Sequence, residues 1–301
     1  MHFRHGCVGN SSVGNFVIMI RFVNAKLNLG LNIVRRRPDG YHDLETVFYP
    51  VGMHNGTPVN PEPFCDILEI TPAGSTEFVF SGRTVDCPLE KNLVYKAWAV
   101  FKENYPQLPS FCIHLEKHLP DGAGLGGGSA DASAVICMLN ELCGAPFNDE
   151  QLAAMALKLG ADCPFFIYNR PCYAEGVGER LEPVDVDLSG WWCLLVKPEV
   201  SISTKEAFAG VTPGAPVHPL RATVKMKPEE WQGRMVNDFE GSLFPNHEVL
   251  PQIKERLLGK GAVYAAMSGS GSTVFGLFRS REEAADALSE FGEHYTALCL
   301  M

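Results

Sequence analysis

The chain has 301 residues, more than one small hydrophobic core usually supports, so two compact domains are expected. Its 25 lysines and arginines against 35 aspartates and glutamates give a net charge of −10, which excludes a generally basic nucleic-acid binder. No apolar run approaches the roughly 20 residues that span a bilayer, so no membrane segment is expected.

Residues 1–18 match nothing that follows them. The run Gly9–Asn15 is typical of a flexible tail, and the apolar stretch at 16–20 is too short for a secretory signal. A short targeting peptide and a natural start at Met19 are the two alternatives, and the second is simpler. We expect a tail over residues 1–18 that takes no part in the fold.

The first half of the chain predicts mostly strands, then helices. Apolar and polar residues alternate from Val23 to Ile33, the period of a half-buried strand. The turn Pro38-Asp39-Gly40 predicts that a second strand through residues 46–49 returns as a hairpin. Further strands are expected at 66–70, 77–80, 111–115 and 164–168, and helices at 92–105, 129–142 and 149–160.

The second half predicts a similar mixture. Strands are expected at residues 191–196, 262–266, 273–278 and 295–299, helices at 251–258 and 281–291, and a loop at 211–219. Strands mixed with helices in this order indicate an α+β fold. We place the boundary near residue 180, which gives domains 19–180 and 181–301.

A glycine-rich segment carries the clearest chemical signal. Five glycines fall within residues 122–128 and lead directly into the helix at 129–142. Glycines let a backbone approach a ligand closely, and the N–H groups at a helix start attract anions, so phosphate is the natural ligand. No lysine follows as in a P-loop, the G-x-G-x-x-G spacing alone is weak evidence for a dinucleotide site, and protein-kinase motifs are missing. The alternative without a binding function is that these residues form a flexible linker. Residues 120–130 are called the first glycine loop below.

A second glycine loop, residues 267–272, lies between two predicted strands. It is either a hairpin turn of small residues or a loop whose amides approach the first glycine loop and close over phosphates. The sequence favours neither.

Polar residues on the predicted strand at 23–33 are unusual for a solvent face. Asn24, Asn28 and Asn32 flank Lys26, where lysine, glutamate and threonine would be typical of exposure. Amides beside one amine suit a cleft that holds hydroxyls and phosphate. Asp162, between Gly160 and Pro164, is most simply a helix cap.

These motifs together resemble a known family. Residues 120–130 are similar to the phosphate-binding motif of the GHMP kinases, and residues 267–272 to their third motif. Residues 25–29, 37–42, 160–164 and 174–179 resemble, within that superfamily, the 4-diphosphocytidyl-2-C-methyl-D-erythritol kinases. The resemblance spans about residues 22–300.

The resemblance implies a two-domain fold, with an N-terminal domain like ribosomal protein S5 domain 2 and a ferredoxin-like C-terminal domain. It implies ATP-dependent phosphorylation of the 2-hydroxyl of 4-diphosphocytidyl-2-C-methyl-D-erythritol, in non-mevalonate isoprenoid synthesis in the bacterial cytoplasm. ATP is the implied phosphoryl donor, with Mg²⁺ or a similar cation. The implied partners are small molecules, with no nucleic acid or membrane, and the chain is expected to be a monomer or homodimer.

The resemblance also assigns residues. Asp162 becomes the general base and Lys26 the group that polarises the acceptor hydroxyl and balances charge. Ser129 is either a helix N-cap or a contact to phosphate or metal; no metal ligand is named otherwise. The ATP-binding set is Pro120, Asp121, Gly122, Ala123, Gly124, Leu125, Gly126, Gly127, Gly128, Ser129 and Ala130, with Asn92 and Lys117 beside the adenosine, although spacing alone makes these two ordinary surface residues.

For the acceptor, the resemblance implies that Tyr41 and Phe208 sandwich the cytosine, that His42 hydrogen-bonds its edge, and that Asn28 belongs to the same site. The bland alternative is a Tyr41 that packs on the sheet. The third glycine motif comprises Ser268, Gly269, Ser270 and Gly271.

Two rival functions stay open. Homoserine and mevalonate kinases share the superfamily but lack the hairpin sequence Asp39-Gly40-Tyr41-His42. A non-catalytic nucleotide-binding protein would need neither Lys26 nor Asp162.

Overall fold

The structure, a computed structural model, describes residues 18–54, 57–58, 64–84 and 87–301. The predicted tail at 1–18 lies outside these residues apart from Ile18. The chain divides into two compact units that are discontinuous in sequence: the first comprises residues 1–25, 53–121 and 126–169, and the second 26–52, 122–125 and 170–301. The boundary placed near residue 180 stays a prediction. In the part of the chain that the structure describes, no helix has the length and apolar character to cross a membrane.

The first unit contains a four-stranded sheet in the order β1-β6-β8-β7. Its strands are β1 (Met19–Val23), β6 (Asp66–Pro72), β7 (Glu77–Gly82) and β8 (Phe111–Lys117). β6 pairs antiparallel with β1 and β8, whereas β7 is parallel to β8. Every second residue of β8 is buried, from Phe111 to Lys117, so Lys117 points into the protein like the apolar residues before it. A small ladder joins β4 (Met53–His54) and β5 (Thr57–Pro58).

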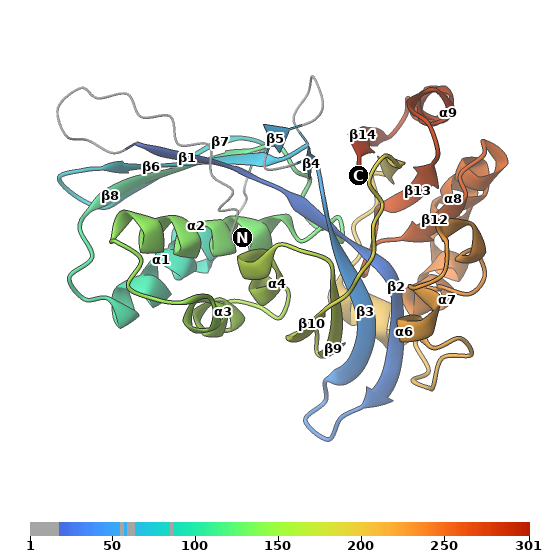
Figure 1. Cartoon of the computed structure of the whole chain (residues 1–301), viewed down its shortest axis with the longest axis horizontal. Coiled ribbons are helices and arrows are strands. Elements are labelled where there is room, and N and C mark those ends of the chain that lie inside the picture. Colours follow the sequence, from blue (N-terminus) through green and yellow to red (C-terminus); the bar gives the residue numbers. More distant parts are fainter. Residues whose placement is uncertain (1–17, 55–56, 59–63, 85–86) are drawn as a thin grey trace. The chain divides into compact units, whose positions relative to one another are not determined.

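Helices pack on one face of this sheet (Figure 1). They are α1 (Leu93–Asn104), α2 (Gly127–Leu142), α3 (Asp149–Leu157) and α4 (Cys163–Tyr168). α2 packs against α1, β1 and β6. The strand predicted at 164–168 is wrong, because these residues form α4. Pro164 stands in the first turn, where its fixed φ suits a helix, and short apolar runs do not distinguish strands from helices.

The second unit contains a sheet in the order β10-β9-β3-β2. Its strands are β2 (Ala25–Arg36), β3 (His42–Val51), β9 (Cys172–Gly176) and β10 (Arg180–Pro183). The predicted hairpin at residues 38–40 is confirmed, since β2 and β3 are neighbours and the Arg37 N–H donates to the Tyr41 carbonyl. The half-buried strand is wrong in one respect. β2 is buried on both faces from Ala25 to Ile33, so its asparagines and Lys26 lie inside the protein.

A second sheet of this unit runs β12-β13-β11-β14, and its ladders are antiparallel. Its strands are β11 (Trp192–Lys197), β12 (Tyr264–Met267), β13 (Val274–Phe278) and β14 (Tyr295–Leu300). α8 (Val249–Gly259) and α9 (Arg281–Leu288) pack on it. Short helices that no pattern predicted are α5 (Thr204–Ala209), α6 (Leu220–Thr223) and α7 (Asp238–Leu243). One buried cluster joins Leu31 and Ile33 of β2 to these strands and helices, and the α+β class is confirmed.

Candidate active site

Lys26 is buried at the start of β2, with 3 % of its surface exposed. Its ammonium group donates to Asn28 Oδ1 at 2.5 Å and to the carbonyl of Gly124 at 3.2 Å. The ring of Phe48 lies 5.0 Å from the ammonium nitrogen. Lys26 therefore contacts the part of the first glycine loop that belongs to its own unit.

Both polar atoms of the Asn28 side-chain amide have hydrogen-bond partners. Its Nδ2 donates to Thr46 Oγ1 at 2.9 Å, and that hydroxyl donates to the Gly30 carbonyl at 2.6 Å. These bonds turn Oδ1 of Asn28 toward Lys26. Thr46 is a residue that sequence reasoning missed, because a threonine on a strand carries no signal of its own.

The two glycine loops touch within the second unit. The Ser268 hydroxyl donates to the Gly124 carbonyl at 2.9 Å, and the Thr273 N–H donates to the Ala123 carbonyl at 3.3 Å. Gly124 has a φ of +73°, and a Cβ at this position would collide with the Ser268 carbonyl. The second glycine loop is thus the β12–β13 connection and also a support for the first loop.

The last residues of the first glycine loop, from Gly127 on, form the start of α2. Gly126 is the N-cap in a left-handed conformation, with φ +71°, so the helix begins at Gly127 and exposes its first N–H groups there. Ser129 is the third residue of the helix, so its alternative as a plain N-cap is wrong. A helix start of this kind suits a phosphate.

Asp162 stands directly before α4, but its side chain makes no capping hydrogen bond. Asp162 thus occupies the N-cap position that the sequence predicts, with Pro164 in the first turn, but without the capping bond. The neighbouring Cys163 is buried, which raises the pKa of its thiol to about 11. Asp162 belongs to the first unit and Lys26 to the second. Their joint action on one acceptor hydroxyl stays a prediction.

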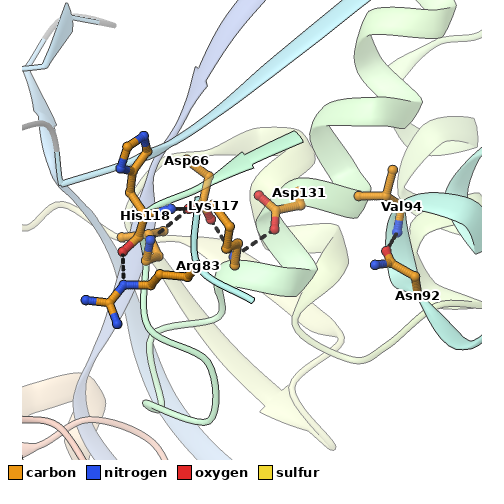
Figure 2. Close-up of polar contacts among 8 residues, drawn as sticks. Asp66, Arg83, Asn92, Val94, Lys117, His118 and Asp131 are labelled. Atoms are coloured by element: carbon orange, nitrogen blue, oxygen red, sulfur yellow. Dashed lines mark hydrogen bonds and ion pairs between the residues drawn. The ribbon is translucent and has the colours of Figure 1, made fainter. Parts of the chain in front are cut away.

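Asn92 and Lys117 are buried, which corrects their description as surface residues. Asn92 caps α1 by accepting the Val94 N–H at 2.8 Å. The Lys117 ammonium group lies between two carboxylates, Asp66 Oδ2 at 2.5 Å and Asp131 Oδ2 at 2.9 Å, as Figure 2 shows. Lys117, Asp66 and Asp131 are called the buried triad below.

The buried triad also holds the backbone that leads into the first glycine loop. Asp66 Oδ1 accepts the N–H groups of His118 and Leu119 at 2.6 and 2.8 Å. Asp131 lies in α2, so the triad ties the entry of the loop to the helix that follows it. Asp66 is 51 residues from Lys117 in sequence, and no local pattern could have paired them.

Burial and charge act differently on the members of the triad. Burial lowers the pKa of Lys117, but Asp131 and Asp66 outweigh it, so the pKa is raised. Burial raises the pKa of Asp131 well above its usual value, and the nearby Lys117 does not cancel the effect. Lys117 therefore keeps its charge firmly, whereas burial makes the ionisation of Asp131 costly.

Aromatic side chains gather where the acceptor base was predicted. Phe208 of α5 stacks on His42 of β3, with ring centroids 4.7 Å apart and planes at 17°. Its ring also meets Phe239 edge-on at 4.8 Å. Tyr41 is 66 % exposed, so the alternative that it packs on the sheet is wrong. The ring that stacks on Phe208 is His42, and the Tyr41–Phe208 sandwich stays a prediction.

Two family models match the chain. The model described as GHMP kinases N terminal domain matches residues 92–170, and the one described as GHMP kinases C terminal matches residues 222–297. Together they include parts of both units and both glycine loops.

Full-length relatives are more specific. The 4-diphosphocytidyl-2-C-methyl-D-erythritol kinase of Parabacteroides distasonis is 51 % identical over 260 residues, covering 86 % of this chain and 92 % of that protein. The enzyme of the same name from Bacteroides fragilis is 48 % identical over 269 residues, covering 88 % and 94 %.

Solved structures agree in fold. A crystal structure of 4-(cytidine 5'-diphospho)-2C-methyl-D-erythritol kinase has a TM-score of 0.77 at 33 % identity, covering 94 % of this chain and all of that one. Homoserine kinase from Cytophaga hutchinsonii has a TM-score of 0.71 at 17 % identity, covering 96 % and 95 %, which shows the shared fold alone. The chain therefore belongs to the GHMP kinases, and within them to the family of the 4-diphosphocytidyl-2-C-methyl-D-erythritol kinases.

Proposed function

We propose that the chain transfers the γ-phosphoryl group of ATP to the 2-hydroxyl of 4-diphosphocytidyl-2-C-methyl-D-erythritol, in the non-mevalonate synthesis of isoprenoid precursors. The observation that carries this proposal is the 51 % identity to a curated relative of that name along 86 % of the chain. Solved homoserine and mevalonate kinases resemble the chain at only 12–18 % identity, which supports the shared fold but not their substrates.

In this reaction Asp162 accepts the proton of the 2-hydroxyl, the oxygen bonds to the γ-phosphorus, and ADP leaves. A positioned base of this kind contributes about 10²–10⁴-fold. Lys26 orients the same hydroxyl and balances the charge that develops near it. Support for its role comes from its ammonium group, which donates to the first glycine loop through the Gly124 carbonyl.

The phosphates of ATP lie along the first glycine loop in this proposal. The N–H groups at the start of α2 face them, and residues 268–271 of the second glycine loop close over them. Asn92 and Lys117 border the adenosine. Because two carboxylates hold the Lys117 ammonium, this residue shapes the wall of the site rather than lending its charge to the nucleotide.

Mg²⁺ is part of the proposal, since it neutralises phosphate charge in phosphoryl transfer. This ion is usually held by one or two protein oxygens together with the phosphates. Among the described residues, no group of three or more histidines, cysteines and carboxylates could hold a metal by itself. Ser129, in the first turn of α2, offers the hydroxyl that fits such shared binding.

The cytidine end is assigned to Tyr41, His42 and Phe208, with Asn28 nearer the reacting hydroxyl. The stacked rings of His42 and Phe208 support an aromatic site at this place. His42 already stacks on Phe208, so a cytosine that takes the same face of the Phe208 ring must displace His42, whose ring can then hydrogen-bond the edge of the base.

The test is ADP release in a coupled assay with three acceptors offered separately: the cytidyl diphosphate substrate, mevalonate and homoserine. We expect turnover with the first alone. Turnover with mevalonate or homoserine would favour a relative of the superfamily, and nucleotide binding without turnover on any acceptor would favour a non-catalytic protein.

A further inference from the structure

The short segment formed by Val236, Asn237 and Asp238 connects β2 to the second glycine loop. The carbonyl of Val236 accepts the Leu31 N–H at 2.8 Å, and Asp238 Oδ2 accepts the Ile33 N–H at 2.7 Å. The segment therefore runs alongside the strand that carries Lys26 and Asn28. No family motif quoted for the sequence includes it.

Asn237 lies at the centre of this segment and is 2 % exposed. Its Oδ1 caps α7 by accepting the Phe239 N–H at 3.0 Å. Its Nδ2 donates to two carbonyls of the second glycine loop, Met267 at 2.7 Å and Gly269 at 2.8 Å. A buried amide whose two hydrogens both bind one loop fixes the path of that loop.

The loop residue between the two carbonyls is Ser268. Its hydroxyl donates to the Gly124 carbonyl, which also accepts the Lys26 ammonium group. A continuous series of hydrogen bonds therefore leads from Asn237 through the second glycine loop to the first loop and to Lys26, all within the second unit.

We infer that Asn237 is a positioning residue for phosphoryl transfer, because it holds the second glycine loop where the loop supports Gly124 and orients Lys26. This inference rests on the proposed function. A shift of about 1 Å in a group that aligns reactants can cost about 100-fold in rate, which is the scale of effect expected here.

The competing explanation is that Asn237 only caps α7. Asn237→Asp and Asn237→Ser separate the two roles, since both side chains are good N-caps but an ionised aspartate has no donor and serine has only one, so neither can donate to both carbonyls. Asn148→Asp is the matched control. Asn148 caps α3 in the first unit through the Gln151 N–H, and its bonds do not involve either glycine loop.

The experiment measures kcat, the KM of the cytidyl acceptor, the Kd of a non-hydrolysable ATP analogue and Tm for the wild type and the three variants. For both Asn237 variants we expect kcat to fall about 10–100-fold and the analogue Kd to rise about tenfold, with the acceptor KM within about threefold. The Tm should fall because buried hydrogen bonds are lost, but it should stay above the assay temperature. Asn148→Asp is expected to leave kcat and both binding constants unchanged.

Normal kcat and analogue affinity in folded Asn237 variants would overturn the inference, and so would a loss that appears only when Tm falls to the assay temperature. The proposed function fails separately. If the wild type binds the analogue but does not phosphorylate the cytidyl acceptor, the function is wrong, while the analogue Kd of the Asn237 variants still decides the inference.

Discussion

Among the described residues, two lysines are buried, one in each unit, and their surroundings differ. Lys117 of the first unit is bound to two carboxylates. Lys26 of the second unit donates to the Asn28 amide oxygen and to the Gly124 carbonyl, both of which belong to the proposed substrate and ATP sites. An ammonium group paired with buried carboxylates cannot serve a ligand without leaving them uncompensated, at a cost of about 3–5 kcal/mol.

The difference suggests a division of work between two buried charges of the same kind. The buried triad stabilises the backbone on both sides of the first glycine loop. The network around Lys26, made of Asn28, Thr46, Ser268 and Asn237, holds the ammonium group against the first glycine loop, where the proposed function gives it a role in the reaction. We therefore expect the first arrangement to stabilise the fold and the second to serve the proposed reaction.

The largest effect on kcat is expected from a change at Asp162, because this carboxylate is the proposed general base. Asp162→Asn keeps the shape of the side chain but removes its proton affinity, so kcat should fall about 10²–10⁴-fold. The Kd of an ATP analogue should hardly change. Asp149→Asn, on the exposed first residue of α3, is the control and should keep full kcat. An Asp162→Asn enzyme with most of its turnover would show that another group accepts the proton.

Asp66→Asn tests whether the buried triad stabilises the fold. Asparagine has a single side-chain oxygen, so its NH₂ group must face either the Lys117 ammonium group or the N–H groups of His118 and Leu119. We expect the free energy of unfolding in urea to fall by about 3–5 kcal/mol, the usual cost of breaking a buried pair. A loss below 1 kcal/mol would mean that the buried triad does not hold the loop.

Gly124→Ala tests the contact between the two glycine loops. Gly122 and Gly124 both have positive φ, +58° and +73°, but only at Gly124 does a Cβ meet other atoms, the carbonyls of Ser268 and Gly271. Gly122→Ala is therefore a matched control for the backbone strain. We expect Gly124→Ala to be less stable to urea than Gly122→Ala by about 1–3 kcal/mol, as for overpacking elsewhere. Equal stabilities would contradict the contact.

Asp131→Asn should change the free energy of unfolding least of these substitutions. The pH dependence of that change tests whether burial raises the pKa of Asp131. The pKa of Asp131 is raised in the folded state above its ordinary 3.8, so its ionisation destabilises the fold at pH values above the folded-state pKa. That penalty shrinks as the pH falls and vanishes below 3.8. Lys117 and Asp66, which face Asp131, are present in both proteins.

We therefore expect Asp131→Asn to equal or exceed the wild type by about 0–1 kcal/mol at pH 8, and to lose that advantage as the pH falls toward 4. Urea unfolding at several pH values measures this. A variant that is less stable at pH 8 and recovers in acid would show that Lys117 keeps Asp131 ionised.

Local patterns predicted most of the elements, because alternation and helical spacing are properties of neighbouring residues. They failed at α4, where Cys163–Tyr168 is too short for a helical period to appear. They also failed for the burial of β2, since alternation cannot tell that its polar face lies inside the protein. The helices α5 to α7 were not predicted for the same reason, because each is too short to show a helical period.

The site shows a similar division. Lys26, Asn28 and the glycine loops were predicted because their residue types are chemically unusual for their places. Asp66 and Asn237 were missed because their partners, Lys117 and Met267, are 51 and 30 residues away. For His42 and Phe208, the residues were predicted but their mutual stacking was not, because it depends on how α5 packs beside β3.

The central claim is that Lys26 takes part in the reaction, whereas Lys117 stabilises the fold. The most direct test compares the variants Lys26→Met and Lys117→Met. For each variant, kcat per folded molecule and the free energy of unfolding are needed. Lys26→Met should lose about 10²–10³-fold in kcat and little stability, as expected for a group that stabilises transition-state charge. Lys117→Met should lose about 3–5 kcal/mol of stability, while its folded molecules keep kcat close to the wild type. Normal turnover in Lys26→Met, or a stable Lys117→Met enzyme with impaired turnover, would contradict the account.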